Sequence, residues 1–142
     1  MPIRCYINPE FNLILFIGDG LVTGSDYFKA AEIASQDKLR KWGMVTIVDL
    51  LSAETDFELQ DMRFAIEFTN NLSRKKLEPE QVIALTSSKA IHLISDSLKL
   101  LPSKVPVKLD LLNSVDELIS FLGISERKQE FMAFYDQCKN GK

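Results

Sequence analysis

A short β-branched run in the middle of the chain most constrains the fold. Residues 45–50 read VTIVDL, which is almost continuously apolar and too short for a helix. This pattern is typical of a strand buried on both faces of a parallel sheet. We expect a polar bend after it and then a long helix over residues 57–76, because Thr55 with Glu58 forms a capping box. The rest of the chain repeats this unit of strand, bend and capped helix.

The flanking segments predict the other elements of the same architecture. Residues 3–8 and 11–17 form an antiparallel hairpin, because Asn8-Pro9-Glu10 between them favours a turn. The further expected elements are a helix from the Thr23/Asp26 capping box to Gly43, a strand over 81–86, a helix from Ser87-Ser88 to residue 101, an edge strand over 105–109, a helix between Ser114 and Gly123, and a final helix over about 126–138. The order ββαβαβαβαα predicts one domain over residues 1–142, an α/β fold with a mainly parallel five-stranded sheet and an N-terminal antiparallel strand.

Composition narrows the class of protein. A chain of 142 residues can bury a core without disulfides or metals, and its net charge of −3 does not favour nucleic-acid binding. The two cysteines form no CxxC pair and no Cys/His ligand set, so we expect no structural zinc and a reduced, cytoplasmic setting. The sequence shows neither a signal peptide nor a membrane span, so membrane insertion is not expected.

Polar and glycine residues at the expected carboxyl ends of the strands are candidates for a ligand site. The glycines at 18, 20 and 24 are spaced one residue wider than those of a dinucleotide-binding fingerprint. The alternative to nucleotide binding is that these glycines break the strand at a sharp bend. Asp49 could likewise serve as a turn residue rather than a ligand group. The candidate ligand-binding residues are Gly18, Asp19, Gly20, Thr23, Asp49, Thr86 and Ser87. We expect no catalytic residue, metal ligand or cofactor, and His92, the sole histidine, is expected at the surface.

The long predicted helix has two apolar stripes on opposite sides. One contains Phe57, Phe64, Phe68 and Leu72, and the other contains Leu59, Met62 and Ile66. Only one stripe can lie on the sheet, so the other requires a different cover. Two covers are open at this point, namely the C-terminal helix of the same chain or the same helix of a second subunit in a two-fold dimer.

The order of motifs resembles a known family of small bacterial proteins. Residues 18–31, 45–50 and 113–123 are similar to STAS-like proteins related to SpoIIAA, the sporulation anti-sigma-factor antagonist, which are grouped with the SEC14-like fold. The resemblance implies a non-catalytic module that binds a protein partner or a small apolar, lipid-like ligand. Antagonists carry an Asp-Ser-Ser-Gly phosphorylation site after the central strand, whereas this chain has Phe57-Glu58-Leu59-Gln60 there. The alternative is a nucleotide- or metal-dependent binding protein or enzyme with its site at the carboxyl edge of the sheet.

Overall fold

The computed structural model describes residues 2–41, 43–56, 60–61, 80–89, 91–93 and 107–141. The elements of the described residues are β1 (Ile3–Asn8), β2 (Leu13–Val22), α1 (Gly24–Ser35), β3 (Val45–Thr55), β4 (Glu80–Leu85), β5 (Val107–Leu112), α4 (Val115–Leu122), the 3-10 turn η1 (Ser125–Arg127) and α5 (Lys128–Lys139). The predicted helix over residues 57–76 lies outside the described residues except for Gln60 and Asp61, which are helical. Of the predicted helix over 88–101, residues 89 and 91–93 are described and helical.

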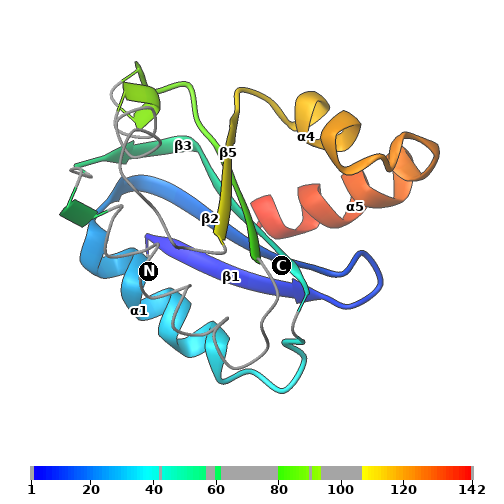
Figure 1. Ribbon diagram of the computed structural model, residues 1–142, viewed down its shortest axis with the longest axis horizontal. Helices are drawn as coiled ribbons and strands as arrows, with labels where there is room; N and C mark the ends of the chain where they lie inside the picture. Colours follow the sequence, from blue (N-terminus) through cyan, green and yellow to red (C-terminus); the bar gives the residue numbers. More distant parts are fainter. Residues whose placement is uncertain are drawn as a thin grey trace.

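The described strands form one five-stranded sheet in the order β1-β2-β3-β4-β5. β1 pairs antiparallel with β2, and each later pair is parallel. The hairpin therefore occupies one edge of the sheet and β5 the other, as expected. The predicted fold class is confirmed, and Figure 1 shows the strands between α1 on one side and α4 and α5 on the other.

Both faces of the sheet are covered, which explains why the first halves of β2 and β3, residues 13–17 and 45–50, are almost continuously apolar. On one face, Leu15, Ile17 and Ile47 pack with residues of α4 and α5. On the opposite face, Phe16 and Val48 pack with α1. Successive side chains of a strand point to opposite faces, so a two-sided core requires apolar residues at every position.

The central strands are longer than the sequence suggested. The prediction of a bend after residue 50 was wrong, because β3 continues to Thr55. The prediction that the glycines at 18 and 20 break the preceding strand was also wrong, because β2 continues to Val22. Pairing passes from Ile17–Asp49 to Asp19–Ser52, so β3 contains one more residue than β2 over this interval. This β-bulge lets polar and glycine residues remain in the ladder instead of ending it.

α1 begins where the capping box predicted. The Thr23 hydroxyl accepts the N–H of Asp26, and the Asp26 carboxylate accepts the N–H of Thr23 at 3.0 Å. The hydrogen bond from the Thr23 backbone lowers the pKa of Asp26. The helix ends at Ser35 and not near Gly43, because the Asp37 carboxylate accepts the N–H of Leu39 in a local turn that competes with the helix.

The C-terminal helices also match the expected caps. The Ser114 hydroxyl accepts the N–H of Glu117, while the Glu117 carboxylate accepts the N–H of Asn113. Gly123 ends α4 with φ of 69°, a conformation that glycine adopts without strain. β5, described from Val107 to Leu112, continues past the expected end at residue 109, because its pairing with β4 extends to Leu85 and Leu112. Residues 105 and 106 of the predicted strand lie outside the described residues.

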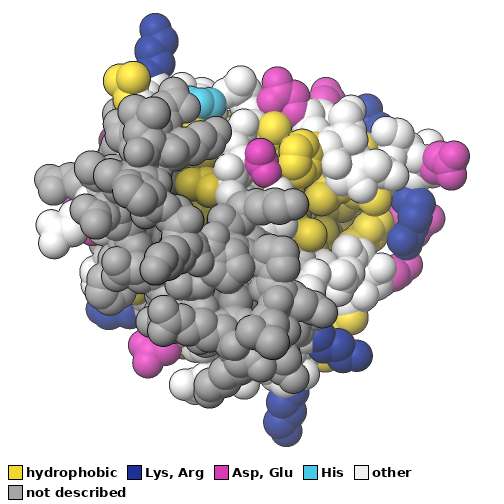
Figure 2. Space-filling view, in the orientation of Figure 1, with side chains coloured by type: hydrophobic (Ala, Val, Ile, Leu, Met, Phe, Trp, Pro, Cys, Tyr) yellow, Lys and Arg dark blue, Asp and Glu magenta, His cyan; other side chains and the backbone are white. Residues whose placement is uncertain are grey.

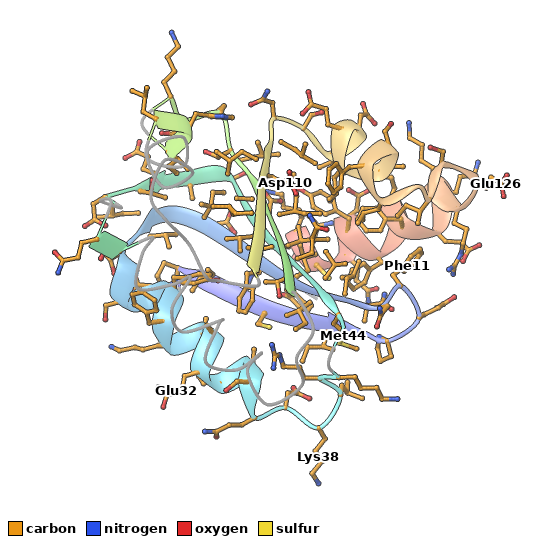
Figure 3. The ribbon with its side chains drawn as sticks, viewed as in Figure 1. Phe11, Glu32, Lys38, Met44, Asp110 and Glu126 are labelled. Carbon is orange, nitrogen blue, oxygen red and sulfur yellow. The ribbon has the colours of Figure 1, made fainter. Side chains whose placement is uncertain are left out.

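The β1–β2 turn is tied to the start of α5. The Arg127 guanidinium donates to Glu10 at 2.8 Å and to Glu130 at 2.9 Å, and it lies 4.2 Å from the centre of the Phe11 ring. Figure 3 shows Phe11 at this end of the molecule, beside α5. The contact holds the first turn of α5 over the hairpin.

Candidate functional site

Asp49 is the buried charged residue around which the candidate site is built. It lies on β3 next to the bulge, and its side chain is 0% exposed. One carboxylate oxygen, Oδ1, accepts the N–H of Leu51 at 3.0 Å. The other, Oδ2, accepts the hydroxyl hydrogen of Tyr135 and lies 3.4 Å from Nζ of Lys139. A buried carboxylate needs such partners, because it has lost its hydration.

A second set of contacts surrounds the C-terminal end of α5. The Lys139 ammonium donates to the Ser52 hydroxyl at 3.0 Å. The Arg4 guanidinium donates to the carbonyls of Cys138 and Lys139, and it forms an ion pair with Asp19 at 3.2 Å. These carbonyls lie in the last turn of α5, where the Cys138 carbonyl also accepts the N–H of Gly141 at 3.0 Å. A cation is favourable at the C-terminal end of a helix. We define the β3–α5 polar cluster as Arg4, Asp19, Asp49, Ser52, Tyr135 and Lys139.

The charges of the polar cluster balance. Arg4 and Lys139 each face a carboxylate, namely Asp19 and Asp49. Burial raises the pKa of Tyr135, and the hydrogen bond to Asp49 and its charge act in the same direction. Tyr135 therefore remains a protonated donor at neutral pH. Burial also raises the pKa of the neighbouring Cys138 thiol to about 11, so this cysteine is not a thiolate nucleophile.

Part of the polar cluster has the arrangement of a nucleophile, a base and an orienting acid. Ser52 is exposed, its hydroxyl contacts Lys139, and Lys139 contacts Asp49. Lys139, however, faces the Asp49 carboxylate as an ammonium group, which is a donor only. An ammonium group cannot accept a proton from Ser52, so this geometry holds α5 in place rather than activating the serine.

The structure brings together only some of the predicted ligand-binding residues. Asp19 and Asp49 belong to the polar cluster. Thr86 is 2% exposed, and its hydroxyl accepts the N–H of Ser88. Leu85, which pairs with Asp49, packs on the α5 side of the sheet, so Thr86 points to the opposite side. Ser87 is exposed and lies outside the polar cluster. Ligand binding by any of these residues stays a prediction.

Gly18, Gly20 and Gly24 have structural roles. From the sequence alone, these roles could not be distinguished from ligand binding. A Cβ on buried Gly18 would lie 2.9 Å from Cγ2 of Val22, so the side chain is excluded by packing within β2. Gly20 has φ of 68°, which favours glycine. A Cβ on Gly24 would lie 2.8 Å from Oδ1 of Asp61. A carboxylate thus stands at the start of α1, where a bound phosphate would otherwise interact with the helix N-terminus.

His92 has polar partners at the ends of β4 and β5. Its Nε2 lies 3.4 Å from the carbonyl oxygen of Thr86 and 3.2 Å from Oδ1 of Asn113. A carbonyl only accepts, so the Nε2 atom carries the hydrogen in the contact with Thr86. The described part of the chain contains no group of three or more His, Cys, Asp or Glu side chains placed to hold a metal ion.

Four members of the polar cluster were not found from the sequence, namely Arg4, Ser52, Tyr135 and Lys139. Tyr135 and Lys139 are four residues apart and therefore lie on one helix face. This spacing was the signal in the sequence that could have grouped the two side chains. Nothing in the sequence indicated that this face meets Asp49, which lies 86 residues before Tyr135. The predicted dimer contacts Leu59, Met62 and Ile66 lie outside the described residues, so the cover of that stripe stays a prediction.

The strand order and the layer of helices define the class: an α/β protein with a SpoIIAA-like fold. A similar solved structure is that of an uncharacterized DUF3478-family protein from Shewanella loihica PV-4, which has a SpoIIAA-like fold. The two structures align with a TM-score of 0.53 at 11% sequence identity, over 84% of this chain and 93% of that chain. No family model and no curated protein sequence matches this chain. None of the helices in the described ranges is long and apolar enough to cross a membrane.

Proposed function

We propose that this protein is a non-catalytic binding module that acts through contacts with protein. The observation that carries the proposal is the internal pairing of the polar cluster. Asp49 is fully buried and bonded within the chain, and each cation of the cluster faces a carboxylate. Groups that are committed to holding the fold are not free for proton transfer. The SpoIIAA-like fold supports a regulatory or binding role, without identifying a partner.

The second candidate is a nucleotide- or metal-dependent site at the carboxyl edge of the sheet. The observation that favours it is that Asp19 and Ser52 lie side by side at this edge and are both exposed. Against it stands the Asp61 carboxylate at the start of α1, which would repel a phosphate. The negative charge of Asp61 therefore favours the first candidate, the non-catalytic binding module, over a phosphate-binding site.

A thermal-shift experiment separates the two candidates. With millimolar ATP, NAD or Mg²⁺, we expect the melting temperature of the full chain to stay unchanged. A specific ligand at about 100 times its Kd would stabilise the fold by about 2.7 kcal/mol and raise the melting temperature by several degrees. Such a rise, abolished by Asp19→Ala, would support the edge site and contradict the proposal.

The partner that we propose is a second copy of this chain, and a small apolar ligand is the alternative occupant. The support is the second apolar stripe of the predicted helix, formed by Leu59, Met62 and Ile66. The core of a stable protein interface is apolar and poor in charge. Apolar side chains also reach the surface over α4 and α5 (Figure 2), where Met132 and Phe134 are only partly buried.

Leu59→Glu and Met62→Glu are expected to convert a dimer into a monomer, because each would bury a carboxylate in the apolar interface. Sedimentation equilibrium gives the mass in solution for the wild type and the variants. Ile33→Glu on α1 is the matched control, since Ile33 is 65% exposed and should tolerate the charge. A wild type that is monomeric at all concentrations would rule out the second copy as partner.

A further inference from the structure

Positive charge is concentrated in the second half of α1 and the loop that follows it. Of the 17 basic and 20 acidic residues of the chain, four basic and two acidic ones fall within residues 29–41, which gives this segment a net charge of +2. The rest of the chain, with 13 basic and 18 acidic residues, has a net charge of −5. An anionic surface therefore attracts this segment and, on balance, repels the remainder of the molecule.

The loop after α1 is folded into a turn that exposes Leu39 among basic residues. The Asp37 carboxylate accepts the N–H of Leu39 at 2.9 Å, and the Asp37 carbonyl accepts the N–H of Arg40 at 3.1 Å. Leu39 is 51% exposed, and Lys38 and Lys41 on either side of this turn are exposed as well. Figure 3 shows Lys38 pointing away from the rest of the protein. The turn thus presents an apolar side chain together with cations.

A second exposed apolar side chain lies in the last turn of α1. Ile33 is 65% exposed, and exposed Lys29 precedes it by four residues, so the two share one helix face. The Ile33 carbonyl accepts the N–H of Gln36 at 3.2 Å, which keeps the chain compact between Ile33 and the turn at Asp37. We define the basic tip as Lys29, Ile33, Lys38, Leu39, Arg40 and Lys41.

The composition of the basic tip fits an anionic lipid surface better than nucleic acid. Lysine and arginine attract anionic headgroups, and an exposed leucine or isoleucine gains free energy at the boundary of the acyl chains beneath them. Nucleic acid attracts the same cations through its phosphates but has no apolar layer to receive Leu39 and Ile33. The acidic residues Glu32 and Asp37 reduce the attraction, so the binding is expected to be weak and sensitive to salt.

We propose that the basic tip is a contact surface for a membrane that contains anionic phospholipid. In this contact Leu39 and Ile33 lie at the boundary between headgroups and acyl chains, and the cations lie among the anionic headgroups. The protein rests on the surface of the bilayer without spanning it. This inference goes beyond the proposed protein partner, because it uses neither the predicted stripe of residues 59–66 nor the helices α4 and α5.

Flotation of the full chain with lipid vesicles tests the proposal. The vesicles consist either of phosphatidylcholine alone or of phosphatidylcholine with about 30% phosphatidylserine. We expect the protein to float with the phosphatidylserine vesicles only and to be released as the salt concentration is raised. A protein that remains in solution with both kinds of vesicle at low salt would overturn the proposal.

A matched pair of charge reversals distinguishes the basic tip from the net charge of the chain. Lys38→Glu is expected to weaken binding to the phosphatidylserine vesicles about tenfold or more, because repulsion replaces attraction. Lys89→Glu is the control, since exposed Lys89 follows the carboxyl end of β4, whereas Lys38 precedes the amino end of the parallel neighbour β3. Equal weakening by both substitutions would contradict a role of the basic tip.

Leu39→Gln distinguishes a lipid surface from a general polyanion. The substitution keeps the charge and a similar length, so we expect binding to phosphatidylserine vesicles to weaken several-fold through the lost apolar contact. Binding of single-stranded RNA, measured in parallel, should be weaker than vesicle binding at the same salt concentration. Unchanged vesicle binding by Leu39→Gln, or RNA binding as strong as vesicle binding, would mean that the basic tip is a polyanion site and would refute the lipid surface. Circular dichroism checks that each variant is folded.

Discussion

Asp49→Leu is expected to lower the free energy of unfolding by about 3–5 kcal/mol, the usual effect of breaking a buried ion pair on one side only. The substitution leaves the Leu51 N–H and the Tyr135 hydroxyl without their acceptor. It also removes the carboxylate that faces Lys139. Urea denaturation measures the effect, and an unchanged slope with denaturant shows that the change is one of stability.

Asp19→Leu is the matched control for Asp49→Leu. The same substitution is made one strand away, on a carboxylate whose side chain is about half exposed and paired with Arg4. An exposed ion pair of this kind contributes about 0–1 kcal/mol, so the control should remain close to the wild type. Asp49→Asn should fall between the two, because it retains an acceptor for Leu51. Equal effects of the Asp49 and Asp19 substitutions would contradict the role assigned to burial.

Phe131→Ala is expected to destabilise the protein by about 3–5 kcal/mol, through lost apolar contacts and the cavity that remains. Phe131 is 0% exposed at the centre of the core on the α5 side. Its ring packs edge-on against Phe11 at 5.6 Å and contacts Phe134 and Tyr135. Thermal and urea unfolding monitored by circular dichroism measure the loss.

Phe121→Ala on α4 provides the comparison for Phe131→Ala. Phe121 is 47% exposed, so its removal should change stability by about 0.5 kcal/mol or less. A loss comparable to that of Phe131→Ala would mean that Phe121 is covered in solution, for example by a second subunit. Repeating the measurement over a range of protein concentrations distinguishes that case, because stability then depends on concentration.

The local elements of the fold follow from local chemistry. The capping residues Thr23 and Ser114, with Asp26 and Glu117 three residues later, predicted where two helices begin, because caps depend only on neighbouring backbone groups. The alternation of strands and helices predicted the mainly parallel sheet, since parallel neighbours require crossover connections. The ends of the strands were predicted less well. The sequence predicted a bend after residue 50, whereas β3 continues through a β-bulge to Thr55.

The sequence by itself determined the class of fold, the edge position of the hairpin and the starts of α1 and α4, because these depend on periodicity and on contacts between near neighbours. Only the tertiary structure decided the role of Asp49. As part of a short strand it could have been a ligand group, a turn residue or a buried partner. Its donors Tyr135 and Lys139 come from the far end of the chain, and packing of α5 on the sheet, not any local pattern, brings them to it.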